Sequence, residues 1–116
     1  MKPAPYGYAR AATLDDVFSL LAEHGEDAKI LAGGQSLMAT LNMRLSEPEL
    51  LIDINRIDGL AGIQDTGDAI RIGTMTRHVD VEESDVIATH APLITAAMEH
   101  VAHPAVRNRG TFGGSI

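Results

Sequence analysis

The first 54 residues alternate between two hydrophobic periodicities, and this alternation constrains the fold more than any other feature. Short apolar runs typical of strands lie at residues 6–9, Ala28–Leu31 and residues 50–54. Apolar residues at helical spacing fill the two intervals between these runs, at Leu14–His24 and around residues 37–45. A strand–helix–strand–helix–strand order predicts an α/β unit with a parallel sheet.

The ends of both helices are marked by local signals. Thr13 and Asp16 have the spacing of a capping box, and Gly25 is a typical helix stop. We expect the second helix to end at Glu47-Pro48, because proline disfavours a helical conformation in the residue before it. Its expected apolar stripe consists of Leu37, Met38, Leu41 and Leu45.

The pattern changes after residue 60. Two alternating runs, at residues 62–65 and 69–73, flank Thr66-Gly67-Asp68, which is a hairpin signal. We therefore place a candidate boundary within residues 55–60 and divide the chain into a first α/β lobe, residues 1–56, and a second lobe, residues 57–116.

Two further helices are expected in the second lobe. Residues 76–83 read as a short helix, and Pro92 suits the first turn of another. The second of these helices should end at His103-Pro104, and residues 105–109 read as extended. Its expected apolar face consists of Leu93, Ile94, Ala97, Met98 and Val101.

Composition excludes several classes of function. The formal net charge of −7 argues against nucleic acid as the main partner, since an acidic chain repels a phosphate backbone. The chain has no Cys, which excludes disulfides, thiolate catalysis and a Cys-ligated iron–sulfur cluster in this chain. A cysteine-free chain fits a cytoplasmic protein. Its apolar runs are too short to span a membrane.

Two loops share one design, in which a strand-like run leads into Gly-Gly and a small polar residue. The first glycine loop comprises residues 32–37, and the second comprises residues 111–115. Glycine allows unusual backbone conformations and close approach, so both loops could direct N–H groups at a diphosphate. Neither a P-loop nor a G-x-G-x-x-G motif is present, and Gly-Gly also commonly forms a simple turn. The spacing alone leaves both interpretations open.

Other polar residues have weaker signals. The five histidines lack the clustered acidic or thiolate partners of a metal site, so we expect none. Three arginines, Arg44, Arg107 and Arg109, could reach phosphates or an acidic partner, although solvated arginines are expected more often. Asp53 ends a strand, where it could accept hydrogen bonds from loop amides or be only a polar residue at the strand exit.

The two loops and their surroundings resemble the FAD subunits of the xanthine dehydrogenase and aerobic carbon monoxide dehydrogenase family of molybdenum hydroxylases. The resemblance rests on residues 32–37 with the strand at 50–54, on residues 100–109, and on residues 110–115. Phe112 and Ser115 stand where many members have an aliphatic residue and Asn. Relatives continue past this loop with further strands and a C-terminal domain, so we expect this chain to be the N-terminal part of such a subunit.

The resemblance implies a fold and a set of binding residues. The fold is an α/β (α+β) FAD-binding domain of the vanillyl-alcohol-oxidase/p-cresol-methylhydroxylase type, with the cofactor between two lobes and the second lobe incomplete. The loops would wrap the FAD pyrophosphate, and Val101 would lie near the flavin. The implied cofactor-binding residues are Ala32, Gly33, Gly34, Gln35, Ser36, Leu37, Val101, Thr111, Phe112, Gly113, Gly114 and Ser115.

The resemblance also implies a function. It is that of an FAD-dependent oxidoreductase subunit, which passes electrons from iron–sulfur clusters through FAD to an external acceptor. The molybdenum cofactor and the 2Fe-2S clusters would reside on partner subunits, and no side chain here would be a catalytic acid or base. The alternative is a non-catalytic interaction module without flavin. Bound flavin absorbs visible light, so an absorbance spectrum separates the two.

Overall fold

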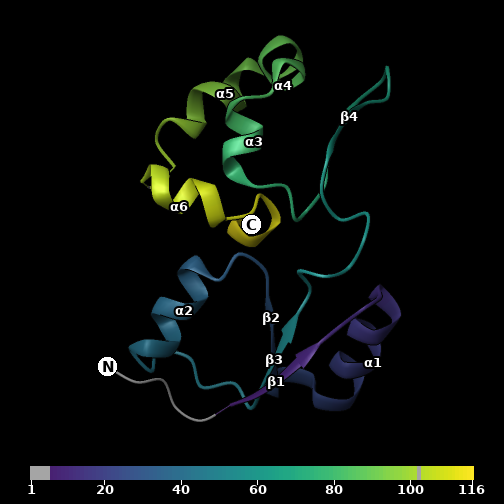
Figure 1. The fold of residues 1–116 in the computed structure, drawn as a ribbon, viewed down its shortest axis with the longest axis vertical. Coiled ribbons are helices and arrows are strands. Elements are labelled where there is room, and N and C mark those ends of the chain that lie inside the picture. The colour runs from purple at the N-terminus through teal and green to yellow at the C-terminus, as the bar shows by residue number, and fades with distance from the viewer. Residues whose placement is uncertain (1–5, 102) are drawn as a thin grey trace. The chain divides into compact units, whose positions relative to one another are not determined.

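The computed structural model describes residues 6–101 and 103–116 of the chain. The chain divides into two compact units, Met1–Asp58 and Gly59–Ile116. Figure 1 shows the course of the chain through both units. Within the described residues, no helix has the length and apolar character required to cross a membrane.

The first unit contains a parallel three-stranded sheet. Its strands are β1 (Gly7–Arg10), β2 (Ala28–Leu31) and β3 (Leu50–Asp53), in the order β1-β3-β2. Both neighbours pair with β3 in parallel, which confirms the predicted sheet. The central strand is the most buried, and its Leu51 and Ile52 are almost inaccessible to solvent. The carboxyl ends of all three strands meet at Asp53, which lies opposite both Arg10 and Leu31.

Helix α1 (Leu14–His24) packs against β2 and β3, and its bounds match the sequence prediction. The predicted capping box is present, because Thr13 Oγ1 accepts from the N–H of Asp16 at 3.2 Å and Asp16 accepts from the N–H of Thr13. Gly25 ends the helix with a φ of +54° and begins the 3₁₀ turn η1 (Gly25–Asp27). The residues within and next to α1 were therefore sufficient to predict where this helix begins and ends.

Helix α2 (Gln35–Asn42) ends earlier than Glu47-Pro48, so the predicted end was wrong. It closes with a Schellman motif, in which Leu45 N–H donates to Thr40 O and Arg44 N–H donates to Leu41 O. Arg44 adopts the left-handed conformation that this motif requires, with φ +56°. The chain leaves the helix axis there, so Leu45 is 71% exposed rather than part of the apolar stripe.

The second unit begins with the predicted hairpin. Strands β4 (Ile63–Asp65) and β5 (Ile70–Ile72) pair antiparallel. Three isoleucines of this hairpin pack against a core formed by helices α3 (His78–Glu82), α4 (Asp85–His90) and α5 (Pro92–Met98). The buried residues at the centre of this core are Val81, Ile87 and Met98.

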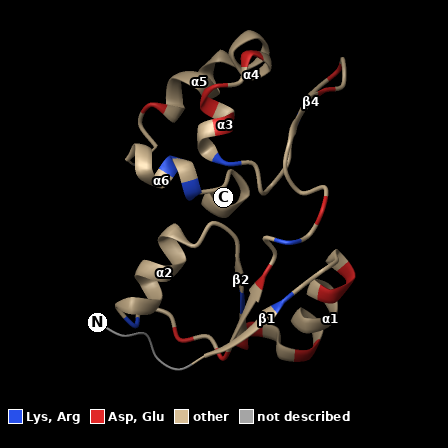
Figure 2. Ribbon diagram, in the orientation of Figure 1, with Lys and Arg blue, Asp and Glu red and all other residues tan. Residues whose placement is uncertain are grey.

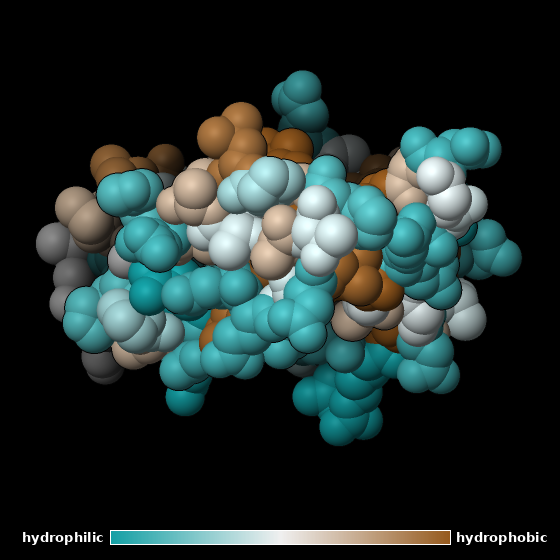
Figure 3. All heavy atoms as spheres, turned by 90° about the horizontal axis from the view of Figure 1, so that it is seen from above, coloured by the Kyte–Doolittle hydropathy of each residue, from teal (hydrophilic) through white to brown (hydrophobic). Residues whose placement is uncertain are grey.

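Helix α4 was missed by the sequence analysis, and α5 is shorter than its apolar pattern. Ser84 caps α4, because its Oγ accepts from the N–H of Ile87 at 3.2 Å. Pro92 occupies the first turn of α5 as predicted, but the helix ends at Met98 and Leu93 is 80% exposed. Figure 3 shows that apolar residues, coloured brown, remain on the surface among the polar ones.

Residues 105–109 are helical, which corrects the prediction of an extended segment. They belong to α6 (Pro104–Arg109). His103 caps this helix, because its Nδ1 accepts from the N–H of Ala105 at 3.2 Å. Pro104 sits at the first helical position, where its missing N–H costs nothing. The proline was read as a helix breaker, although at this position it starts a new helix.

Candidate functional site

The first glycine loop, residues 32–37, connects the carboxyl end of β2 to the start of α2. Gly34 has a φ of +79°, which L side chains rarely adopt, and its C=O begins the helix by accepting from the N–H of Met38 at 2.9 Å. The carboxyl ends of parallel strands are where open α/β sheets place their ligands. The loop thus combines a glycine-dependent turn with a favourable position on the sheet.

The backbone N–H groups of this loop are available to a ligand. Within the part of the chain that the structure describes, the N–H groups of residues 33–37 donate to no protein acceptor, and α2 has no side-chain cap at Gly34. Several free donors at a helix N-terminus, together with the positive end of the helix dipole, favour an anion. These five consecutive N–H groups could donate hydrogen bonds to a diphosphate.

A hydrogen-bonded cluster lies behind this loop at the end of β3. Asp53 is buried, and its Oδ1 accepts from the backbone N–H of Asn55 at 2.9 Å and from the side-chain Nδ2 at 2.7 Å. Its Oδ2 accepts from the hydroxyl of Tyr8. Burial is the largest influence and acts to raise the pKa of Asp53, but these hydrogen bonds together lower the pKa below its usual value. The carboxylate is therefore held ionised.

Asp53 is more than a polar residue at a strand exit, because it accepts from the backbone N–H and the side chain of Asn55 in the segment that follows β3, although it accepts from no amide of the first glycine loop. Sequence reasoning did not identify Asn55, whose Nδ2 also donates to the carbonyl oxygen of Ala32 at 2.8 Å. The available signal was an Asn two residues beyond a strand-terminal Asp, a short-range pattern that commonly forms Asx-type hydrogen bonds.

The second glycine loop, residues 111–115, pairs through its first three residues with residues 74–77. Thr111 forms an isolated antiparallel bridge with Arg77, and the N–H groups of Phe112 and Gly113 donate to Thr76 O and Thr74 O, each at 2.8 Å. The loop ends in the 3₁₀ turn η2 (Gly113–Ser115), which agrees with the predicted turn. Several of its amides are therefore already used, unlike those of the first glycine loop.

Close packing explains the glycines of this region. A Cβ on Gly113 would overlap Thr74 Oγ1 and lie 2.7 Å from Thr74 Cβ. A Cβ on Gly110 would lie 2.9 Å from the ring of His78. These two glycines are required because the backbone approaches its neighbours closely, whereas Gly34 is required for its φ.

His78 is a buried contact of the second glycine loop that sequence reasoning did not single out. It is 3% exposed, its backbone N–H donates to Gly110 O at 3.0 Å, and its Nε2 lies 2.8 Å from Ser115 Oγ. Burial lowers the pKa of this imidazole, so it is held neutral. The only early signal was its place in the short helix expected at residues 76–83.

Val101 and Phe112 both pack against the core of the second unit. They are partly buried against the cluster of Val81, Ile87 and Met98. Among the predicted binding residues, those at 32–37 belong to the first unit, and those at 111–115 together with Val101 belong to the second.

Arg107 is not a solvated arginine, which corrects that expectation. Its side chain is 12% exposed, its Nε lies 2.9 Å from Glu82 Oε2, and its Nη1 donates to Val101 O at 3.1 Å. Arg107 thus joins α6 to α3, whereas Arg44 and Arg109 are exposed. Figure 2 shows the basic positions of α6 in blue and the acidic positions of α3 in red.

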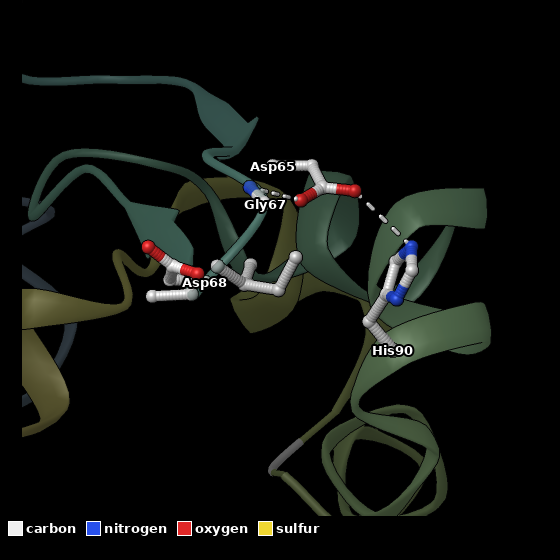
Figure 4. Close-up of a pocket in the computed structure, with 6 residues that line it drawn as sticks. Asp65, Gly67, Asp68 and His90 are labelled. Carbon is white, nitrogen blue, oxygen red and sulfur yellow. Dashed lines mark hydrogen bonds and ion pairs between the residues drawn. The ribbon is translucent and has the colours of Figure 1, made fainter.

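A separate pocket of about 260 Å³ lies beside the β4–β5 turn (Figure 4). Asp65 contributes its carboxylate, which accepts from the N–H of Gly67 at 2.9 Å and lies 3.2 Å from His90 Nε2. Asp68 adds a second acid to the lining. Two carboxylates make this pocket unfavourable for a diphosphate, and it includes no residue of either glycine loop. No group of three potential metal ligands occurs among the described residues.

Comparison with known protein families assigns nearly the whole chain to one family. The sequence matches, over residues 4–116, the family described as the FAD binding domain in molybdopterin dehydrogenase. It is 47% identical over 116 residues to the 6-hydroxypseudooxynicotine dehydrogenase complex subunit alpha of Paenarthrobacter nicotinovorans, with 100% of this chain and 39% of that protein covered. It is 42% identical to the carbon monoxide dehydrogenase medium chain of Hydrogenophaga pseudoflava, covering 40% of its length.

Solved structures agree with this grouping. The chain superposes on carbon monoxide dehydrogenase from Hydrogenophaga pseudoflava with a TM-score of 0.94 at 42% identity, covering 98% of this chain and 40% of the other. Quinoline 2-oxidoreductase from Pseudomonas putida 86 gives a TM-score of 0.92 at 38% identity, with coverage of 99% and 40%. The chain spans about two fifths of the length of the curated relatives it matches.

Proposed function

Because this chain belongs to the family of FAD-binding domains of molybdopterin dehydrogenases, we propose that its two glycine loops hold FAD within a larger electron-transferring subunit. The observation that carries the proposal is the run of free backbone N–H groups at residues 33–37. The free N–H groups and the helix start carry partial positive charge, which suits the anionic diphosphate of FAD. The several oxygens of the diphosphate can accept hydrogen bonds from these donors. Bound FAD supplies the redox chemistry, taking up electrons and passing them to an external acceptor.

The two loops have different proposed roles. In the first, the amides of residues 33–37 bind phosphate oxygens, and the hydroxyl of Ser36 adds a further donor. In the second, the N–H groups of Phe112, Gly113 and Gly114 already donate within the protein and the side chain of Thr111 is buried, so the proposed donor is the exposed hydroxyl of Ser115. Thr111 and the glycines would contribute by shaping the loop. Val101, which packs against the same core cluster as Phe112, completes the proposed set.

The finer fold assignment is also a proposal. We assign the chain to the vanillyl-alcohol-oxidase/p-cresol-methylhydroxylase type, with residues 1–56 as the first lobe and residues 57–116 as the start of the second. The parallel sheet of the first unit and the antiparallel hairpin of the second support this division.

The proposed partners are a molybdenum-cofactor subunit and an iron–sulfur subunit. The relatives are named as a medium chain and as a subunit of a dehydrogenase complex, which supports a heteromeric assembly. This chain has no Cys to ligate an iron–sulfur cluster, so the proposed route brings electrons from a partner.

The test uses the full-length subunit that contains this chain. The purified subunit should show the visible absorbance of a flavin, and after flavin removal it should rebind FAD stoichiometrically in a calorimetric titration. A subunit that folds but neither carries nor binds FAD would contradict the proposal and favour the flavin-free interaction module.

A further inference from the structure

The side chain of Asn55 has a single possible orientation in this structure. Its Nδ2 lies 2.8 Å from Ala32 O and 2.7 Å from Asp53 Oδ1. Both neighbours can only accept, so the two hydrogens of the amide are both used. The flipped amide would direct its oxygen at two other oxygens, which makes that rotamer unfavourable.

The partner that orients Asn55 is itself fixed. Asp53 Oδ1 also accepts from the backbone N–H of Asn55 at 2.9 Å, and Oδ2 accepts from the hydroxyl of Tyr8. Asp53 is 8% exposed and is the last residue of the central strand of the sheet. The chain of contacts therefore runs from the rigid sheet, through Asp53 and Asn55, to the first glycine loop.

The contact with Ala32 determines the direction of the next N–H group. A trans peptide unit is planar, with its C=O and N–H pointing in opposite directions. Because Asn55 binds the carbonyl of Ala32, the N–H of Gly33 in the same peptide unit points away from Asn55. The preceding carbonyl, Leu31 O, is also held, by the N–H of Ile54 at 3.2 Å. Two successive carbonyls are thus bound by the segment that leaves β3.

We propose that Asn55 is a positioning residue for the first glycine loop, holding the Ala32–Gly33 peptide so that the free N–H groups face the diphosphate. This inference rests on the proposed function. Asn55 contacts the loop through the carbonyl of Ala32 and acts by orienting the backbone, so it is not itself a ligand of the cofactor. Preorganised donors bind an anion more tightly than donors that must be ordered on binding.

The test compares ligands with and without a diphosphate in the full-length, flavin-free subunit. Asn55→Ala should raise the Kd for FAD and for ADP about two- to twelvefold, since one hydrogen bond contributes about 0.5–1.5 kcal/mol. The Kd for riboflavin, which has no diphosphate, should not change. Asn42→Ala is the matched control, because Asn42 is an exposed asparagine at the far end of α2.

A second variant tests whether a donor is required. Asn55→Asp has nearly the same shape, but at neutral pH it places a carboxylate against Asp53 and Ala32 O. At pH 8, Asn55→Asp should bind FAD more weakly than Asn55→Ala does. The FAD affinity of Asn55→Asp, relative to that of the parent protein, should recover as the pH falls, because a protonated carboxyl can donate a hydrogen bond. A structural role that is independent of donation would give no such recovery.

The outcomes separate the inference from the function on which it rests. If the parent subunit binds no FAD, the proposed function fails. If it binds FAD and Asn55→Ala binds FAD equally well, the function stands and the positioning role is wrong. Equal weakening of FAD and riboflavin binding would also overturn the inference, because it would indicate general damage to the fold.

Discussion

The imidazole Nε2 of His78 lies 2.8 Å from Ser115 Oγ, which ties the first turn of α3 to the second glycine loop. The other ring nitrogen, Nδ1, is buried and has no hydrogen-bond partner among the described residues. A charged imidazolium would need acceptors at both nitrogens. The site therefore favours the neutral ring, and burial lowers the pKa of His78.

The lowered pKa predicts a pH-dependent stability. Well above pH 6.5 the ring is neutral in both folded and unfolded protein, so its contribution to stability is fully present. As the pH falls through 6.5, the unfolded chain binds the proton first, and stability is lost. His78→Gln should lower the free energy of unfolding by about 1–2 kcal/mol at pH 8.

The measurement is the melting temperature of parent protein and His78→Gln between pH 8 and pH 5. The gap between the two should narrow as the pH falls, because only the parent protein carries this titrating group. A gap that is constant across the range would show that His78 has no depressed pKa.

Gly113→Ala should destabilise the second unit through a steric clash. The new Cβ would overlap Thr74 Oγ1 and lie 2.7 Å from Thr74 Cβ and 2.9 Å from Thr74 O. Overpacking of this kind costs about 1–3 kcal/mol, which denaturant unfolding can measure. Adding Thr74→Ala removes the hydroxyl and should restore part of the loss. If the single variant is as stable as the parent protein, the close approach of residues 74 and 113 is wrong.

Gly34→Ala should impair FAD binding beyond its effect on folding. The residue has φ +79°, and an added Cβ would meet only Leu31 Cδ1 at 3.4 Å and Met38 Cγ at 3.5 Å. Its folding cost should therefore come from the left-handed conformation alone, about 1–2 kcal/mol. Flavin content should fall further than this cost explains, because the left-handed conformation of Gly34 sets the directions of the free N–H groups on either side of it.

Gly67→Ala in the β4–β5 turn is the matched control for that variant. Gly67 has φ +90° and nothing within 4 Å of an added Cβ, so it carries a similar backbone strain at a position outside both glycine loops. Both variants should lower the melting temperature, but only Gly34→Ala should reduce FAD content in the full-length subunit. Equal FAD content in the two would mean that the first glycine loop is only a turn.

Arg107→Ala should destabilise the packing of α6 on α3 by about 1–3 kcal/mol, because it leaves Glu82 without its partner at 2.9 Å and removes the bond to Val101 O. Arg109→Ala, an exposed position on the same helix, should stay within about 0.5 kcal/mol of the parent. A double-mutant cycle with Glu82→Ala measures the coupling, expected to be about 1 kcal/mol. A coupling near zero would refute the ion pair.

Several elements could be predicted from the sequence because their causes are local. Helix α1 is bounded by a capping box and a glycine stop, all within the residues from Thr13 to Gly25. The hairpin at residues 63–72 and the strand–helix alternation depend on turn residues and side-chain periodicity, which are read over a few positions. The glycine loops were recognisable for the same reason.

Local reasoning failed where a pattern had two possible consequences. Pro104 was read as ending a helix, but His103 caps the next turn and Arg107 anchors it to α3, so the proline begins α6. Leu45 has the right spacing for the apolar face of α2, but the Schellman motif at Arg44 turns the chain away first. Periodicity shows which residues share a helix face only if the helix continues.

Only the tertiary structure could bring together residues that are distant in sequence. Asn55 meets Ala32 because parallel pairing sets the ends of β2 and β3 side by side, and 23 positions separate the two residues. His78 meets Ser115 across 37 positions because the second glycine loop pairs with residues 74–77. The sequence determined which segments could present free amides, since that depends on glycine and on helix starts. The supports behind those segments depend on strand register and on the pairing of distant backbone, which no short stretch of sequence encodes.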